Sequence, residues 1–247
     1  MSLDIDAYIS EIDTNRFGFK IAKVNDFTGN PEEFLQALRN KNVKLILSKI
    51  NCDNIDLINR LESLNFRIKD FQGTYKYELK NYKPLNEKAT NKFLIREFQH
   101  RDTDQLIQIA EEAFVNYGHY SANKRLNPLH CKEIYKDWIK RSCEDNTIAD
   151  KIFVADFNGE IAGFLSFKLH QGNFFYAAGG IGAVSHRYQK KGVFRLITQK
   201  GLKWGNEIGL DWEEHNVLLT NYPTIRSFTN TGFILSRSFT TMHCWID

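Results

Sequence analysis

Apolar and polar positions along the first part of the chain follow two periods. Apolar residues recur at every second position, or in short unbroken runs, and predict strands at 17–24, 43–50, 66–71 and 73–79. Helical spacing follows Asn30-Pro31 and predicts a helix through Leu38, because proline is tolerated in a first turn. A second helix is expected over 55–64, with Asp53 or Asn54 as its N-cap.

After residue 92 the same two periods recur in a different order. Strands are expected at 93–98, 173–184 and 216–221, and one or two strands at 233–246. Asn158-Gly159 interrupts the apolar pattern of 151–170 and predicts a hairpin, because this dipeptide adopts the positive φ angles of a two-residue turn. Helices are predicted at 102–114, with Asp102 as cap, and at 131–142, 193–208 and 224–232.

The segment 79–92 separates the two parts. It is polar and rich in lysine, it contains Pro84, and a new apolar pattern begins directly after it. We therefore expect a small N-terminal α/β domain at 1–88 and a larger domain at 89–247.

Composition and charge narrow the class of protein without naming a reaction. The 247 residues are 42% hydrophobic and 26% charged, and the formal charge of +3 is too small and too dispersed to indicate nucleic-acid binding. Four separated cysteines without a CxxC pair argue against a zinc site or a disulfide framework. Neither a signal peptide nor an apolar run of about 20 residues is present. We expect a cytoplasmic protein, with no metal and no membrane or nucleic-acid partner; a homodimer is one possible assembly.

One basic stretch, 185–196, lies where a predicted strand gives way to a predicted helix. Within it, Gln189-Lys190-Lys191-Gly192 directly precedes the helix. The first amides of a helix have no internal partner, and the helix dipole there favours an anion. Gly192 allows the backbone to approach a ligand closely, and the two lysines add positive charge. The stretch is either a solvated basic turn or a phosphate cradle, and the order of elements around it favours the cradle.

The same stretch resembles the acetyl-coenzyme A loop of the GNAT N-acyltransferases, whose pattern is Gln/Arg-x-x-Gly-x-Gly/Ala. Gln189 and Gly192 match it, whereas Phe194 departs from the small last residue. Hairpin, strand, loop and helix also stand in GNAT order over roughly 93–247. The resemblance implies an α+β fold whose central mixed, splayed sheet is flanked by helices, with a smaller N-terminal domain resembling a partial GNAT.

By this resemblance, acetyl-CoA is the co-substrate, and Ala183 and Val184 contact its acyl and pantetheine part. The other residues expected to bind it are Gln189, Lys190, Lys191, Gly192, Val193, Phe194, Asn221 and Phe228. Two interpretations remain for the glycines of Gly180-Ile181-Gly182: a strand kept thin for pantetheine, or a β-bulge.

The layout also resembles a narrower group, the acetyltransferases of TDP-linked amino sugars such as TDP-fucosamine. These carry an additional small N-terminal domain and a polar, aromatic loop before a helix with Tyr-x-x-Trp, matched here by 116–128 and Tyr135–Trp138. Arginine pairs with phosphate and tyrosine stacks on a base. The acceptor residues expected in this loop are His119, Tyr120, Arg125 and Asn127; a plain polar surface loop is the alternative.

Acetyl transfer to an amine needs a base for the amine and an acid for the leaving thiolate. Asp and Glu are absent between Glu160 and Glu207, so a carboxylate base is not expected on the central strand, and water, His170 or a backbone carbonyl would accept the proton. In GNAT proteins the acid is usually a tyrosine seven residues after the helix-capping Asn, and here that position is Phe228. Tyr222 is the nearest substitute; solvent is the alternative, and Tyr176 and His243 are further candidates.

Two stretches echo each other at a constant offset of 167 residues. Both 54–66 and 221–233 follow an apolar strand, open with Asn, carry Ile four residues later and end in Phe. Either the N-terminal domain is a degraded partial copy of the C-terminal one, or any capped helix before a strand looks like this.

Three hypotheses follow. The first is an acetyl-CoA-dependent N-acetyltransferase that acts on a nucleotide-linked amino sugar by direct transfer in a ternary complex. The second is the same chemistry on another small-molecule or peptide amine. The third, prompted by Phe228, is a coenzyme A binding protein that has lost catalysis.

Overall fold

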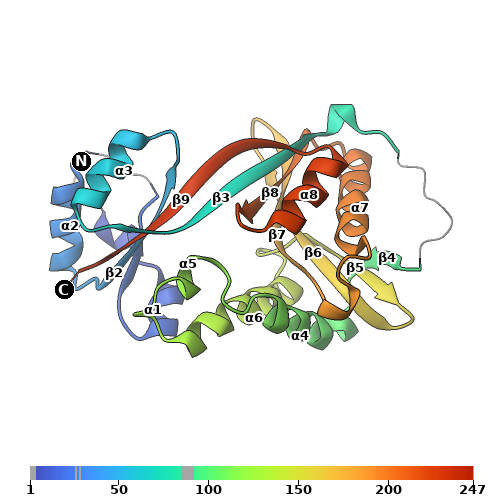
Figure 1. The fold of residues 1–247 in the computed structure, drawn as a ribbon, viewed down its shortest axis with the longest axis horizontal. Helices are drawn as coiled ribbons and strands as arrows, with labels where there is room; N and C mark the ends of the chain where they lie inside the picture. The colour runs from blue at the N-terminus through green and yellow to red at the C-terminus, as the bar shows by residue number, and fades with distance from the viewer. Residues whose placement is uncertain (1–3, 26, 28, 85–91, 247) are drawn as a thin grey trace. The chain divides into compact units, whose positions relative to one another are not determined.

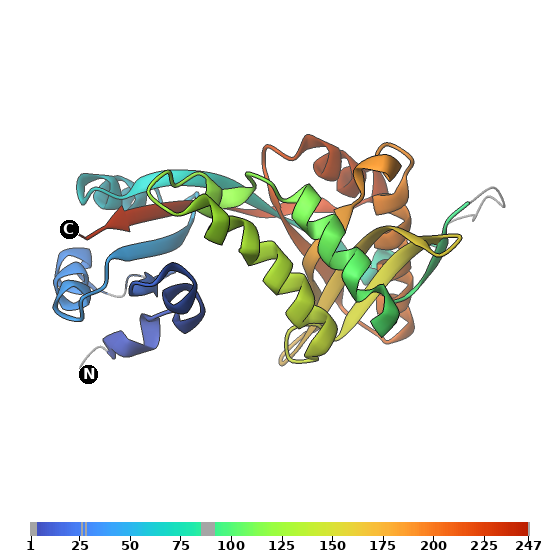
Figure 2. The same ribbon diagram turned by 90° about the horizontal axis from the view of Figure 1, so that it is seen from below.

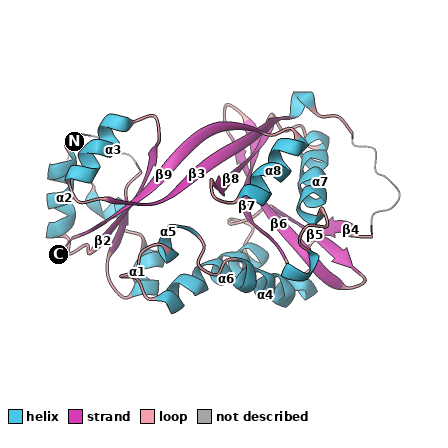
Figure 3. Cartoon of the chain, in the orientation of Figure 1, coloured by secondary structure: helices cyan, strands magenta, loops and turns pink. Residues whose placement is uncertain are grey.

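The computed structural model describes residues 4–25, 27, 29–84 and 92–246 (Figure 1). Nine strands among these residues form a mixed sheet in the order β1-β2-β9-β3-β8-β7-β6-β5-β4, with helices packed against it (Figure 3). The boundary predicted at residue 88 lies outside the described residues. Within the described ranges, no helix combines the length and apolar character needed to cross a bilayer.

Two compact units share the chain, and their segments interleave in the sequence. Unit 1 comprises residues 1–73, 116–131 and 237–247, and unit 2 comprises 74–115 and 132–236. Strands β3 (Arg67–Glu78) and β9 (Ile234–Trp245) each have residues in both units.

Unit 1 packs helices against strands β1 and β2 and the greater part of β9. Its elements are η1 (Ile5–Tyr8), α1 (Glu11–Phe17), β1 (Ile21–Lys23), α2 (Pro31–Asn40), β2 (Leu45–Asn51), α3 (Ile55–Ser63) and α5 (Gly118–Ser121). Strand β1 is parallel to β2, and β2 is antiparallel to β9. Leu38 of α2 and Leu61 of α3 are fully buried with Ile46 of β2, so the apolar stripe of each helix covers the sheet.

Unit 2 contains strands β4 to β8, with helices on both faces (Figures 1 and 2). Its elements are η2 (Leu79–Asn81), β4 (Leu94–Glu97), η3 (His100–Asp102), α4 (Thr103–Ala113), β5 (Lys151–Phe157), β6 (Glu160–Gln171), β7 (Phe175–Val184), η4 (His186–Tyr188), α7 (Val193–Glu207), β8 (Trp212–Leu218) and α8 (Tyr222–Thr231). Helix α6 (Pro128–Glu144) has residues in both units. Strands β4 to β7 are antiparallel, and β8 is parallel to β7. Leu165 and Phe167 of β6 pack with Ile197 of α7, while the alternate Phe164 is buried on the opposite face.

Turn and cap signals predicted several elements correctly. Asn158 (φ 54°) and Gly159 (φ 90°) form the turn between β5 and β6, which confirms the hairpin. Asn30 caps α2 with Pro31 in its first turn, and Asn54 rather than Asp53 caps α3. Helix α7 begins and ends within one residue of its predicted bounds.

Some predicted elements were wrong. The two strands expected at 66–71 and 73–79 are one strand, β3, with Gly73 in its interior. The strand predicted at 17–24 is shortened, because Ser10 caps helix α1 and Gly18 ends it at φ 77°. Asp102 stands at the start of α4 but makes no side-chain cap. Its carboxylate instead accepts hydrogen bonds from Arg96 at 2.7 and 2.9 Å.

The echo between 54–66 and 221–233 extends to local geometry. Asn54 (φ −85°, ψ 65°) and Asn221 (φ −86°, ψ 66°) have nearly the same backbone angles. Each side-chain Oδ1 accepts a hydrogen bond from the amide three residues later. Each helix precedes a 12-residue strand, β3 or β9, that continues into the other unit.

Candidate functional site

Strands β7 and β8 of unit 2 pair along the first part of their length and then separate. The register runs from Tyr176↔Trp212 to Gly179↔His215. Both strands continue, to Val184 and Leu218, without further paired residues between them. We call the point after Gly179↔His215, where the two strands separate, the fork. Beyond it, backbone amides and carbonyls on the β8 side of β7 have no strand partner in the described part of the chain, so they are available to a ligand with amide groups.

A β-bulge in β7 coincides with the fork. Leu165 of β6 pairs with Gly182 and Phe167 pairs with Gly179, so Ser166 stands opposite two residues, Gly180 and Ile181. The Ser166 hydroxyl accepts from the amide of Ile181 (2.9 Å) and donates to its carbonyl (3.1 Å). A Cβ on Gly180 would lie 2.5 Å from Ser166 Oγ. The bulge interpretation of these glycines is therefore confirmed.

The stretch that follows β7 has the predicted strand–turn–helix form. Lys190 (φ 61°) and Gly192 (φ 79°) both adopt left-handed conformations on either side of Lys191. Gly192 occupies the N-cap position of α7, and no side chain caps the helix there. Residues 189–192 are exposed. The first amides of α7 and two lysines thus form a solvent-facing site that suits a phosphate group.

The start of α7 and the end of β7 meet at one glycine. A Cβ on Gly163 of β6 would lie 3.1 Å from side-chain atoms of both Val184 and Val193. The end of β7 and the start of α7 therefore lie next to each other.

Behind the fork lies a buried acid–histidine pair. Glu213 Oε1 and His215 Nε2, both of β8, are 2.6 Å apart, and the two side chains are 0% and 4% exposed. The His215 ring stacks on Phe228 with centroids 4.8 Å apart. Burial raises the pKa of Glu213 above its ordinary value of 4.5, although the hydrogen bond and charge of His215 oppose this. Buried Glu213 Oε2 has no hydrogen-bond partner among the residues that the structure describes.

Sequence reasoning missed this pair because it placed the strand at 216–221 and looked for a carboxylate only on the central strand. The alternation in Trp212-Glu213-Glu214-His215-Asn216-Val217 was the available signal. It puts Glu213, His215 and Val217 on one face, and all three are buried.

The predicted catalytic residues have other surroundings. His170 is exposed near the end of β6 and stacks on Tyr176 at 4.8 Å, which in turn stacks on Trp212 at 4.6 Å. Tyr222 is 61% exposed at the start of α8. Their catalytic roles stay predictions, as does the further candidacy of Tyr176.

The residues predicted to bind acetyl-CoA fall into two groups. Those of the turn, and Ala183 and Val184 of β7, lie at the fork and the start of α7. Asn221 instead uses its side chain to cap α8. Phe228 is buried among aromatic rings, one of them Phe194 at 5.5 Å. The structure brings the first group together, and cofactor contact by any of them stays a prediction.

The predicted acceptor residues lie in unit 1, where each has an intramolecular contact. The Tyr120 hydroxyl donates to Asp13 Oδ1 at 3.0 Å, and Asp13 Oδ2 forms an ion pair with Lys23 at 2.6 Å. The Arg125 guanidinium lies 4.2 Å from the centroid of the Trp245 ring. Asn127 Oδ1 accepts from the amide of Leu129. Substrate contact by these residues stays a prediction.

The fourth acceptor residue, His119, belongs to a directed hydrogen-bond chain. Asn123 Oδ1 accepts from Trp245 Nε1, so its amide nitrogen must donate to His243 Nδ1 at 2.8 Å. His243 Nε2 therefore carries hydrogen and donates to His119 Nδ1 at 2.8 Å. This chain requires both rings to be neutral, and it gives the further catalytic candidate His243 a structural partner.

Acidification should destabilise unit 1 through this chain. Burial lowers the pKa of His119 to about 4 and, with the charges of His119 and Lys69, that of His243 to about 2, from 6.5. Below pH 6.5 the unfolded chain binds protons that the folded chain does not, so stability is full above pH 6.5 and falls as the pH decreases toward 4. Each histidine should cost roughly 2 kcal/mol at pH 5. Urea unfolding at pH 7 and pH 5 measures the loss.

The matched variants are His243→Gln and the exposed His100→Gln. The first should reduce the pH dependence of the unfolding free energy by about half, because one of two titrating rings is removed. The second should leave it unchanged. An unaltered pH dependence in His243→Gln would contradict the assignment.

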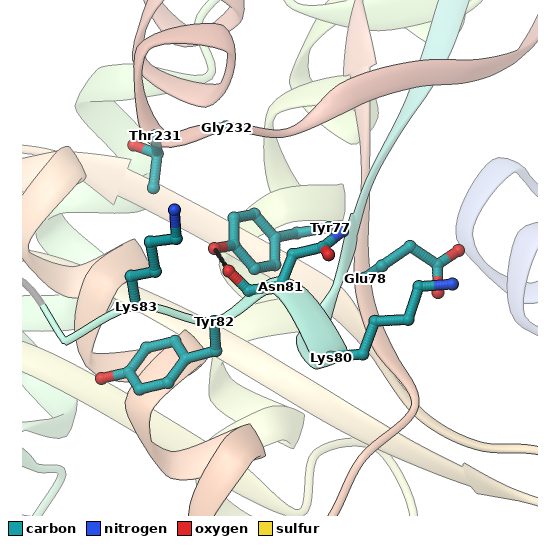
Figure 4. A pocket seen from close by; sticks show the side chains of 8 residues that line it. All are labelled: Tyr77, Glu78, Lys80, Asn81, Tyr82, Lys83, Thr231 and Gly232. Carbon is teal, nitrogen blue, oxygen red and sulfur yellow. Dashed lines mark hydrogen bonds between the residues drawn. The ribbon is translucent and has the colours of Figure 1, made fainter.

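A separate open cleft of about 490 Å³ lies in unit 2, where β3 ends (Figure 4). Tyr77 and Tyr82 line it with Lys80 and Lys83, and Thr231-Gly232 form its wall at the end of α8. The Tyr77 hydroxyl donates to the Asn81 carbonyl at 3.1 Å. The cleft lies at the C-terminal end of α8, where the helix dipole does not favour an anion.

Comparison with known proteins identifies the fold. No family model matches the chain, and no curated protein matches it in sequence. A solved GCN5-related N-acetyltransferase from Sphaerobacter thermophilus is similar, with a TM-score of 0.59, 14% identity, and coverage of 87% of this chain and 65% of that one. The tandem GNAT protein from the clavulanic acid biosynthesis pathway gives 0.64 and 11%, covering 91% and 75%. The chain has the GNAT fold.

Another similar structure, a GCN5-related N-acetyltransferase from Kribbella flavida, gives a TM-score of 0.60 and 11% identity, covering 91% of this chain and 80% of that one. The predicted α+β architecture, a mixed sheet flanked by helices, is thereby confirmed. The fork between β7 and β8 is the splay that the resemblance implied.

Proposed function

We propose that this protein is an N-acetyltransferase that uses acetyl-CoA. One observation carries the proposal. Within a GNAT fold, the strand that leaves the fork, β7, ends beside the start of α7, where no side chain caps the helix. One part offers free backbone groups and the other a cradle for phosphate.

The residues present suit both ends of acetyl-CoA. The amides at the start of α7, with Lys190 and Lys191, would hold the diphosphate. The unpaired edge of β7 beyond Gly179 would hydrogen-bond the amide groups of pantetheine and place the thioester at the fork. Bound there, acetyl-CoA supplies an activated acetyl group.

Direct transfer from the thioester to an amine is the step that this site favours. The four cysteines, Cys52, Cys131, Cys143 and Cys244, all lie outside β7, β8 and the turn. A covalent acetyl-enzyme therefore has no thiol nucleophile at the fork, and the amine would attack acetyl-CoA in a ternary complex.

For the acceptor, we propose the amine of a nucleotide-linked amino sugar. Support comes from the loop pattern at 116–128 and from a similar structure described as a glucosamine N-acetyltransferase region of a fungal β-N-acetylglucosaminidase. That structure gives a TM-score of 0.63 and 12% identity, covering 96% of this chain and 30% of that one.

Two measurements test the proposal. Calorimetry with CoA should show saturable binding, and incubation with acetyl-CoA and a panel of TDP-linked amino sugars should release thiol and form amide. If CoA binds but none of the sugars, other small-molecule amines or peptides is acetylated, the result would favour a coenzyme A binding protein that has lost catalysis. Absence of CoA binding would overturn the assignment of the site.

A further inference from the structure

The Glu213–His215 pair stands at the last paired residues before β7 and β8 separate. His215 is opposite Gly179 in the register, and Glu213 lies two residues earlier on the same face of β8. A buried ionisable pair is costly to maintain unless it is compensated or has a role. Its position at the fork points to a role in chemistry there.

Burial of the pair favours states in which one proton is held between Glu213 Oε1 and His215 Nε2. A lone carboxylate in this place would be buried with Oε2 unpartnered, beside the phenylalanine rings that pack on His215: Phe167, Phe228 and Phe233. An unpaired buried charge of this kind is strongly unfavourable. The low-cost states are glutamic acid with neutral histidine, and carboxylate with imidazolium. In both states His215 Nδ1 carries a hydrogen, because Nε2 is engaged with Glu213 Oε1.

That Nδ1–H group lies against Gly179, the last residue of β7 that pairs with β8. A Cβ added to Gly179 would overlap His215 Nδ1 and Cε1, so the ring edge lies directly against the glycine backbone. The next residue of β7, Gly180, is exposed, and pairing with β8 has ended there. The stacked Phe228 ring fixes the plane of the imidazole. The donor is therefore held one residue before the unpaired edge of β7 begins.

We propose that His215 is the catalytic acid that protonates the departing CoA thiolate and that Glu213 supplies its proton. This rests on the proposed acetyl transfer. The amine nitrogen bonds to the acetyl carbon, and the carbon–sulfur bond breaks with its electron pair on sulfur. His215 Nδ1 gives its proton to that sulfur, and Nε2 retains the proton shared with Glu213. The new amide nitrogen loses one proton to water, and the pair recovers one from water.

The main variant is Glu213→Gln, which keeps size and hydrogen bonding but removes the shared proton. His215 would then be neutral with a single proton, and neutral imidazole is a far weaker acid than the pair. We expect kcat to fall about 10²-fold to 10³-fold with KM and CoA affinity unchanged. The matched control is Glu214→Gln. Glu214 accepts a hydrogen bond from Trp212 Nε1 and lies on the opposite face of β8 from Glu213.

Unchanged kcat in Glu213→Gln, on a substrate that the wild type acetylates, would overturn the inference while leaving the proposed function intact. Failure of the wild type to bind CoA would instead refute the proposed function itself. A second measurement does not need turnover. CoA should shift the 15N resonance of His215 Nδ1 in the wild type, and desulfo-CoA should not, because only the former presents sulfur. Equal effects of the two ligands would place the sulfur elsewhere and overturn the assignment.

Discussion

Replacement of Phe228 by alanine should lower the free energy of unfolding by about 3–5 kcal/mol, the range found for large aromatic residues in well-packed cores. The side chain is 2% exposed and lies among aromatic rings, with centroid distances of 4.8 Å to His215 and 5.1 Å to Phe233. Its removal leaves a cavity between α8 and the sheet, and both rings lose their contact with the Phe228 ring. Urea denaturation measures the change.

Phe174→Ala provides the matched control, because this ring is 59% exposed in the turn between β6 and β7. Its loss should change the unfolding free energy by less than about 1 kcal/mol. A similar small change for Phe228→Ala would contradict the packing described for α8. Packing in the core thus accounts for phenylalanine at position 228, whichever group acts as the catalytic acid.

The parts of the fold that the sequence predicted well are those specified locally. Asn158-Gly159 fixes a hairpin because both residues take positive φ, and Asn30-Pro31 starts α2 because the cap and the proline act within one turn. The turn before α7 was predicted for the same reason, since Gly192 at positive φ and the following helix are neighbours in the chain.

The parts that could not be predicted depend on contacts distant in sequence. Gly73 resembles a break between two strands in the sequence. In the structure β3 lies between β9 and β8, and pairing with these neighbours keeps it extended through Gly73. The hydrogen bond of Tyr120 to Asp13 joins residues 107 positions apart, so the loop residues looked free to bind substrate when considered alone. The compact units also interleave, and a composition seam cannot show this.

The backbone form of the candidate site was predicted where it is continuous in sequence and missed where strands meet. The turn proposed to hold the diphosphate occupies 189–192, so its strand–turn–helix form could be predicted directly. The location of the Glu213–His215 pair could not be predicted from sequence. Only the register Gly179↔His215 shows that the pair lies where β7 and β8 separate.

Gly192→Val should weaken CoA binding about 30-fold to 150-fold. Gly192 has φ 79°, a conformation that a β-branched residue adopts only with strain, and forcing it costs about 2–3 kcal/mol. No atom of the described residues lies within 4 Å of the Cβ position, so crowding is not the cause. The strain is relieved by rearranging the turn, which moves the amides that we propose hold the diphosphate. Calorimetric titration with CoA measures the loss.

The control is Gly172→Val, in the turn between β6 and β7, where the Cβ position is equally open and no positive φ is required. It should bind CoA as the wild type does. If Gly192→Val kept wild-type affinity, the diphosphate would not be held by the start of α7. The proposal places pantetheine, which carries no phosphate, at the fork, so its affinity should change little in Gly192→Val. The two halves of the proposed site are then distinguished by the portion of the ligand that each change affects.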